Sequence, residues 1–284
     1  MGWQITINSS SSQLVDCEPM SASLNALLSN PIRSSQPLED LPVKLGNQSA
    51  RLADCADFVS LPDYQGLSFQ GETSRLMALG HGLTNGRITV EGEVGPLVGE
   101  AMSGGEIRIQ GDAGDFVGRG ATGGRIRIAG NVGDDLAAPS TPHARGVDGL
   151  EVLVSGSAGD RIANRLRRGL IVIAGDAGEM AGYQMRAGTI LIGGQYGIGL
   201  GLQMIRGTIL LNRPSENPGE GRFQPACHYT PTIAGVLNQY LQQIQSPLTF
   251  TPPSQWTRWL GDQTNGCRGE LLVAHSTSVN TFDS

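Results

Sequence analysis

Apolar and polar residues alternate with period two through the middle of the chain, and the alternation recurs about every nineteen residues. This alternation is typical of strands, because successive side chains of a strand point to opposite faces. Each run ends at a glycine, and these glycines follow one another at steps of 19, 19, 26, 19 and 19 residues. They are Gly92, Gly111, Gly130, Gly156, Gly175 and Gly194. The apolar positions share one phase and therefore one face of the predicted strands.

A second apolar residue follows each of these glycines by six positions, which predicts a second, weaker strand in each repeat. These residues are Val98, Val117, Leu136, Ile162, Ala181 and Leu200. Short repeats with two strands, frequent glycine and no helix predict an all-β solenoid. We expect a right-handed parallel β-helix of about seven to eight coils of nineteen residues. The solenoid would cover residues 66–213, with a surface loop at 137–146 producing the one long step.

The two flanking segments do not repeat. Residues 1–65 are expected to form a small N-terminal cap. Residues 214–284 are expected to form a loop, an amphipathic helix and a tail that pack on the solenoid. The helix would begin near Pro231. Its apolar stripe comprises Ile233, Val236, Leu237, Tyr240, Leu241 and Ile244.

The outward-facing position in the middle of each strand changes character along the chain. It is polar in the first repeats, at Thr89, Arg108 and Arg127. It is apolar in the later repeats, at Leu153, Val172, Leu191 and Leu210. The first half is therefore expected to be solvated. The second half must be covered, either by the chain's own C-terminal segment or by another subunit.

Composition narrows the function. The chain has 284 residues, 41 of them glycine, and a net charge of −6, which argues against general nucleic-acid binding. It has no apolar run of membrane length, so we expect a cytoplasmic protein that contacts neither nucleic acid nor membrane. The histidines and cysteines show no metal-ligand spacing: His81, His143, His228, His275, Cys17, Cys55, Cys227 and Cys267. We therefore predict no catalytic, cofactor-binding or metal-binding residue. A Gly-x-Gly-x-x-Gly motif at Gly118 is one turn of the repeat.

Charged residues recur at fixed places in the repeat and offer two candidate surfaces. Five arginines should stack along one edge: Arg165, Arg167, Arg168, Arg186 and Arg206. They could form a solvated edge balanced by nearby carboxylates, or they could contact an acidic partner or an anionic ligand. An acidic row, either a solvated edge or a cation site, comprises Asp115, Asp134, Asp160 and Glu179. Asp112 and Asp176 share another position, but other residue types lie between them.

The glycine-turned repeat resembles a β-helix domain found in two families. One is the C-terminal part of glutamate synthase large subunits, and the other is the C subunit of formylmethanofuran dehydrogenase. The tail is similar to the Gly-Asp…Gly-x-Gly-Glu ending of the second family, through Gly261-Asp262, Gly266 and Gly269-Glu270. Here the middle of that ending is one residue wider. The resemblance is greatest to the corresponding C subunit of the bacterial formyltransferase/hydrolase complex.

This resemblance implies a non-catalytic scaffold subunit in tetrahydromethanopterin-linked C1 metabolism. The complex would convert formyl groups to formate through a methanofuran-type carrier. The implied partners are a formyltransferase subunit, an amidohydrolase-like subunit, and a molybdopterin-type subunit or its degenerate relative. No cofactor is expected on this chain, and metal would lie on other subunits. Two alternatives stay open: a stand-alone β-helix enzyme acting on carbohydrate, and a glutamate-synthase-type β-helix subunit.

Overall fold

The structure is a computed structural model that describes residues 2–8, 13–29, 37–62, 64–141, 145–213, 215–249, 255–266 and 268–274. The α-helices in these ranges are α1 (Ser21–Ser29) and α2 (Thr232–Gln243), and short 3₁₀ helices lie at Glu18–Met20, Leu38–Asp40, Leu52–Asp54, Thr73–Arg75 and Gln263–Asn265. The strands are β1 (Gly2–Ile7), β2 (Val15–Asp16), β3 (Pro42–Leu45), β4 (Gln48–Arg51), β5 (Ala56–Leu61), β6 (Gly66–Gly71), β7 (Leu76–Met77), β8 (Arg87–Val90), β9 (Ser103–Ile109), β10 (Gly123–Ile128), β11 (Asp148–Val154), β12 (Arg168–Ile173), β13 (Thr189–Ile192), β14 (Thr208–Leu211), β15 (Gln224–Tyr229), β16 (Trp256–Gly261) and β17 (Gly269–Ala274).

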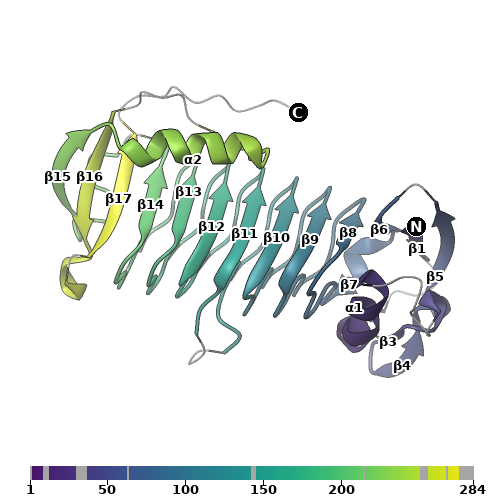
Figure 1. Ribbon diagram of the computed structural model, residues 1–284. Coiled ribbons are helices and arrows are strands. Elements are labelled where there is room, and N and C mark those ends of the chain that lie inside the picture. Colours follow the sequence, from purple (N-terminus) through teal and green to yellow (C-terminus); the bar gives the residue numbers. More distant parts are fainter. Residues whose placement is uncertain are drawn as a thin grey trace.

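Most of the strands form one sheet of 13 strands, in the order β15-β16-β17-β14-β13-β12-β11-β10-β9-β8-β6-β1-β5 (Figure 1). Pairing is parallel from β1·β6 through to β14·β17. It is antiparallel at the two ends, in β1·β5, β16·β17 and β15·β16. A smaller sheet, β4-β3-β2-β7, lies beside α1 near the N-terminus.

The predicted fold class, an all-β solenoid in the form of a right-handed parallel β-helix, is wrong, because the strands make one large mixed sheet that is mostly parallel. Each repeat contributes one strand, and the predicted second strands are turns. On that side single-residue bridges join neighbouring repeats, as between Val94 and Ala113. The second apolar residues are nevertheless buried, from 0% exposed at Val98 to 1% at Ala181. A buried turn and a short buried strand give the same apolar signal.

Glycine serves two purposes in the repeat. At Gly111 the backbone is not left-handed, but an added Cβ would lie 2.7 Å from backbone atoms of the preceding repeat, so close approach requires glycine. At Gly118 φ is +66°. Ala137 and Ala163 occupy the same place in other repeats, at φ of 54° and 55°, so this position needs a left-handed turn. The Gly-x-Gly-x-x-Gly motif at Gly118 therefore belongs to the turn and opens no helix.

The sheet has a hydrophobic cluster on each face. The larger cluster lies behind the sheet, where inward residues of the strands such as Ile107 and Ile171 meet the turn residues. The second lies on the outward face, and comprises Leu153, Leu170, Val172, Leu191, Leu210, Ala234, Leu241, Ile244, Leu248, Trp256, Leu272 and Ala274. Helix α2 runs across β11 to β14 there (Figure 1). The sequence predicted that either the chain's own C-terminal segment or another subunit covers this strip. The structure shows the C-terminal segment in that place.

Helix α2 packs with a face that agrees with most of its predicted apolar stripe: Leu241 and Ile244 are buried, and Leu237 and Tyr240 pack against the same cluster. Its buried residues are Ala234, Asn238 and Leu241, which lie on one side at helical spacing. Ile233 and Val236, both in the predicted stripe, are 61% and 62% exposed. Ala234 faces the sheet there, so the predicted stripe is wrong only at Ile233 and Val236, near the start of the helix.

The tail residues that carry the family resemblance hold the end of the sheet together. Strand β17 pairs with β14, and Thr208 Oγ1 donates to Glu270 Oε1 at 2.7 Å. Asp262 is 0% exposed and accepts the backbone N–H groups of Gln203 and Thr264, each at 2.9 Å. Burial opposes the shift, but the hydrogen bonds from Thr264 and Gln203 hold the pKa of Asp262 below its usual range. These motif residues are therefore structural.

Candidate docking surfaces

The five predicted docking arginines lie near the starts of β12, β13 and β14, in two different environments. Arg165 is half-buried, and its Nε donates to Gln184 Oε1 at 2.7 Å. Gln184 Nε2 in turn donates to Gln203 Oε1 at 2.6 Å. One side chain from each of three successive repeats thus joins a polar row. Arg165 links neighbouring repeats, and this sets it apart from the other four arginines.

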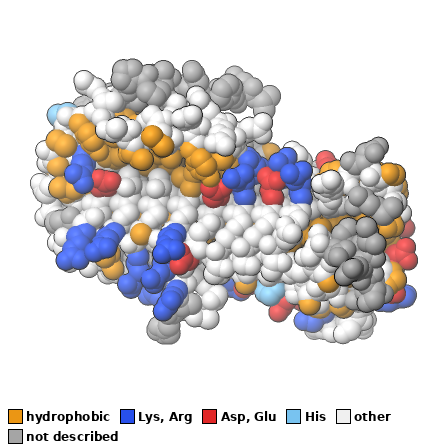
Figure 2. All heavy atoms as spheres, in the orientation of Figure 1, with side chains coloured by type: hydrophobic (Ala, Val, Ile, Leu, Met, Phe, Trp, Pro, Cys, Tyr) orange, Lys and Arg blue, Asp and Glu red, His pale blue; other side chains and the backbone are white. Residues whose placement is uncertain are grey.

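Those four residues, Arg167, Arg168, Arg186 and Arg206, are here called the arginine edge. Arg167 is half-buried and the other three are exposed. Arg168 Nε lies 3.5 Å from Asp148 Oδ1, but its side chain is 81% exposed, and such a pair contributes little to stability. Within the described part of the chain, Arg167, Arg186 and Arg206 have no ion-pair partner. Figure 2 shows basic side chains gathered at this end of the strands, opposite α2.

The register of the repeats brings arginines of the edge close to one another. Arg167 N donates to Val147 O, and Arg186 N donates to the equivalent Leu166 O, so the two arginines occupy the same place in successive repeats. Neighbouring strands lie about 4.8 Å apart, and like charges at that spacing repel. The fold gains nothing electrostatically from this row. It leaves positive charge open to an acidic surface.

Two arginines that the sequence analysis missed extend this edge. Arg268 is exposed and lies two residues before Glu270. Glu270 pairs with Thr208, which in turn follows Arg206 by two residues, so Arg268 and Arg206 occupy equivalent places on neighbouring strands. Arg145 is exposed and precedes Gly146, where an added Cβ would overlap the Arg165 carbonyl oxygen. The signal for Arg268 was present in the sequence. Aligning the last strand with the repeats would have placed it next to Arg206.

The acidic row, predicted as a solvated edge or a cation site, is bonded to the backbone. Asp115 Oδ1 accepts from Asp134 N at 2.9 Å, and Asp134 Oδ1 accepts from Asp160 N at 2.9 Å. Asp160 Oδ1 accepts from Glu179 N at 2.8 Å. Each of these carboxylates therefore satisfies an N–H group of the next repeat. The acidic row therefore connects the turns of successive repeats by hydrogen bonds.

Asp112 and Asp176, which the carbohydrate-enzyme alternative would need as part of a carboxylate pair, have the same structural role. Asp112 Oδ1 accepts from Asn131 N, and Asp176 Oδ1 accepts from Gln195 N, each at 2.6 Å. Ser157 Oγ accepts from Asp176 N at 3.0 Å in the repeat between. Among the described residues of this row, the side chains serve backbone N–H groups. They do not form the pair of facing carboxylates that glycoside hydrolysis uses.

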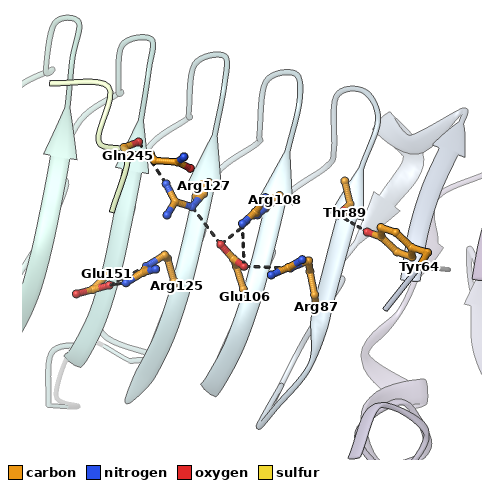
Figure 3. Close-up of polar contacts among 9 residues, drawn as sticks. All are labelled: Tyr64, Arg87, Thr89, Glu106, Arg108, Arg125, Arg127, Glu151 and Gln245. Carbon is orange, nitrogen blue, oxygen red and sulfur yellow. Dashed lines mark hydrogen bonds and ion pairs between the residues drawn. The ribbon is translucent and has the colours of Figure 1, made fainter. Parts of the chain in front are cut away.

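On the polar half of the outward face, one carboxylate gathers three arginines (Figure 3). Glu106 accepts from Arg87 Nε at 3.1 Å, from Arg127 Nε at 3.1 Å and from Arg108 Nη2 at 3.2 Å. Burial opposes the shift, but these hydrogen bonds and charges hold the pKa of Glu106 below its usual range. Thr89 is only 8% exposed, because Tyr64 lies over it with the two hydroxyl oxygens 2.7 Å apart. The expectation of a fully solvated half is corrected at that position.

A second polar contact marks the boundary between the two halves. Arg125 on β10 donates to Glu151 on β11, with Nη2 2.6 Å from Oε2. Tyr240 on α2 donates its hydroxyl proton to Glu151 Oε1. Burial and the hydrogen bond to Glu151 raise the pKa of Tyr240. Glu151 therefore joins the sheet to the helix that covers it.

Histidines and cysteines form no cluster of metal-ligand type among the described residues. Cys17 and Cys55 are buried, and burial with the charge of Asp16 raises the pKa of the Cys17 thiol. Cys227 is exposed on β15, beside His228, whose Nδ1 lies 3.0 Å from Thr257 Oγ1. His143, His275 and Cys267 lie outside the described residues. No helix in the described ranges is long and apolar enough to cross a membrane.

No protein-family model matches the chain, and no curated protein matches it. A solved structure does. It is a chain from the X-ray structure of the formyltransferase/hydrolase complex (FhcABCD) of Methylorubrum extorquens in complex with methylofuran. The TM-score is 0.80 at 28% sequence identity, and the match covers 96% of this chain and 100% of that chain. The similarity therefore extends beyond the repeat into the segments on either side.

Proposed function

We propose that this chain is the non-catalytic scaffold subunit, equivalent to the C subunit, of a formyltransferase/hydrolase complex. In this proposal the complex converts formyl groups to formate through a methanofuran-type carrier, in tetrahydromethanopterin-linked C1 metabolism. Carrier, cofactor and metal belong to the other subunits. The observation that carries the proposal is the end-to-end match to a chain of such a complex, with 28% identity over 96% of this chain.

The arginine edge is the proposed docking surface for an acidic face of a partner subunit. Partners in this proposal are a formyltransferase subunit, an amidohydrolase-like subunit, and a molybdopterin-type subunit or its degenerate relative. The apolar strip on β11 to β14 is no longer a docking candidate, because α2 already covers it. Charge on an interface rim mainly sets association rate and partner choice, and exposed arginines that repel one another suit that use.

The test is to tag the chain in its native cell, recover it at low salt and identify the co-purifying chains by mass spectrometry. We expect formyltransferase and amidohydrolase-like chains. The double variant R167E/R168E should recover at least about tenfold less partner, because like charges juxtaposed in an interface cost more than the roughly 1.4 kcal/mol that a tenfold change in affinity represents. Its thermal unfolding should stay close to that of the parent chain, since Arg168 has only an exposed ion pair and Arg167 has no ion-pair partner among the described residues.

A matched pair of single variants supplies the control. R186E and R213E each reverse one exposed arginine that has no ion-pair partner among the described residues. Arg186 precedes β13 and Arg213 follows β14, so the two residues lie at opposite ends of the strands. Recovery should fall for R186E and stay unchanged for R213E. Equal recovery with both variants would show that the arginine edge is not the docking surface, and recovery of unrelated chains would reject the scaffold proposal.

A further inference from the structure

A cavity of about 550 Å³ lies where the polar half of the outward face meets the C-terminal end of α2. Its walls come from the sheet, through Arg108, Arg127 and Leu153, and from the end of α2 with the segment that follows, through Gln242 and Pro247. Figure 3 shows Arg127 reaching from β10 towards Gln245, which closes one side. Pockets of roughly 300–1,000 Å³ with an apolar wall and a few polar groups are typical of small-molecule sites.

The cavity wall carries an excess of positive charge. Arg87, Arg108 and Arg127 share the single carboxylate of Glu106. Of the neighbouring carboxylates on this face, Glu151 already binds an arginine and a tyrosine, and Glu91 accepts a hydrogen bond from Ser68 Oγ at 3.3 Å. Three arginines share one carboxylate, so net positive charge remains. Two of these arginines, Arg108 and Arg127, line the cavity. An anion would find a complementary field there.

The two cavity arginines also have donors to spare. Arg108 uses Nη2 on Glu106, and its Nε, 3.1 Å from Glu106 Oε1, is buried without a well-aligned hydrogen bond. Arg127 uses Nε on Glu106 and Nη1 on the Gln245 carbonyl oxygen at 3.4 Å. Arg108 Nη1 and Arg127 Nη2 have no partner among the described residues. A guanidinium offers five N–H donors in a planar fork that suits carboxylates and phosphates.

One feature of the site opposes an anion. The C-terminal end of a helix carries partial negative charge, and α2 ends at the cavity. Arg127 offsets this charge directly by donating to the carbonyl of Gln245. The positive charge that remains after Glu106 is paired with the three arginines still exceeds a half charge that is spread over the last helical turn.

We infer that this cavity binds a small organic anion. Its carboxylate or phosphate group would contact Arg108 and Arg127, and its apolar part would lie against Leu153 and Pro247. The inference does not depend on the proposed scaffold role, because it rests on the charge and shape of this one cavity.

Calorimetric titration of the purified chain with benzoate, phenyl phosphate and benzamide tests the inference. All three probes carry one aromatic ring, and they differ in the group offered to the arginines. We expect one or both anions to bind and neutral benzamide not to bind. The anion that binds with the lower dissociation constant shows whether the site prefers a carboxylate or a phosphate group. Equal binding of benzamide and the anions, or no binding of either anion at millimolar concentration, would overturn the inference.

Neighbouring glutamines on α2 provide the matched variants. Gln242 and Gln243 are both exposed, but only Gln242 lines the cavity. Q242E should raise the dissociation constant of the bound anion about fivefold, as a unit charge about 4 Å away in water predicts, and Q243E should leave it unchanged. R108Q, which removes one cavity cation, should weaken binding further, with thermal unfolding as the check on folding. Identical affinities in Q242E and Q243E would place the anion elsewhere.

Discussion

The two halves of the outward face use the same position of the same repeat and differ in what covers them. On β8 to β10 the residues are Thr89, Arg108 and Arg127, and on β11 to β14 they are Leu153, Val172, Leu191 and Leu210. Strand pairing does not separate the halves, since Thr89 pairs with Arg108 just as Val172 pairs with Leu191. The backbone is the same in both, so the side chain at one position per repeat decides the environment.

That single position also decides how each half is stabilised. In the covered half, α2 removes apolar surface from water, and Val172 and Leu191 are 0% and 2% exposed. In the polar half, ion pairs around Glu106 replace burial, and the Arg108 side chain stays 39% exposed. Burial of large aliphatic side chains is worth much more than exposed ion pairs. The comparison therefore predicts unequal losses when matched positions are changed.

The largest loss should come from undocking α2. Leu241 is 0% exposed against the covered half, so L241D would place an unpaired carboxylate there. We expect the free energy of unfolding to fall by about 4 kcal/mol or more, measured by urea denaturation. The uncovered strip should bind a hydrophobic fluorescent dye. V236D, at a side chain 62% exposed on the same helix, is the control and should change neither measurement. Equal dye binding by both variants would contradict a covering role for α2.

A smaller loss should follow from truncation at equivalent places in the two halves. L191A removes a buried leucine from the covered half and should cost about 3 kcal/mol in urea denaturation. R108A changes the matching residue of the polar half and should cost under about 1 kcal/mol, because its ion pair with Glu106 is partly solvated. Similar losses for the two variants would mean that the halves do not differ as the side chains indicate.

Much of the sheet could be predicted from sequence, because period-two alternation fixes both strand position and facing. The pairs Ile88/Val90 and Ile190/Ile192 fall within β8 and β13. The fold class could not be predicted in this way, because Val98 is buried in a turn, where a hydropathy pattern cannot distinguish it from a strand. The face of α2 that packs on the sheet was predicted correctly at Leu241 and Ile244 and missed at Ile233 and Val236. Hydropathy favours Ile233, but the sheet surface admits the smaller Ala234.

The two candidate binding surfaces also differ in how far the sequence predicts them. The arginine edge could be predicted because its members recur at repeat spacing. The cavity could not, because it joins parts of the chain with no common period. Arg127 and Gln245 are 118 residues apart, and only the folded helix brings them together. Glu106 gathers arginines from neighbouring strands, a contact that needs the register as well as the sequence.

A small, pH-dependent effect is expected at the carboxylate at the centre of the polar half. E106Q removes the charge shared by Arg87, Arg108 and Arg127, and should cost about 1 kcal/mol near neutral pH, since its partners are partly exposed. Folding lowers the pKa of Glu106, so the folded chain binds fewer protons there than the unfolded chain. Stability from this group is therefore complete above the ordinary glutamate pKa of about 4.3 and is lost as the pH falls through the lower, folded value.

The difference in urea midpoint between the parent chain and E106Q should accordingly shrink as the pH falls below about 4.3. E93Q is the control, because Glu93 is an exposed carboxylate whose side chain has no hydrogen-bond or ion-pair partner among the described residues. It should match the parent chain at every pH. A parent-to-E106Q difference that stays constant at acid pH would show that shape and packing, and not the charge of Glu106, hold the three arginines, so the polar half would then resemble the covered half in what stabilises it.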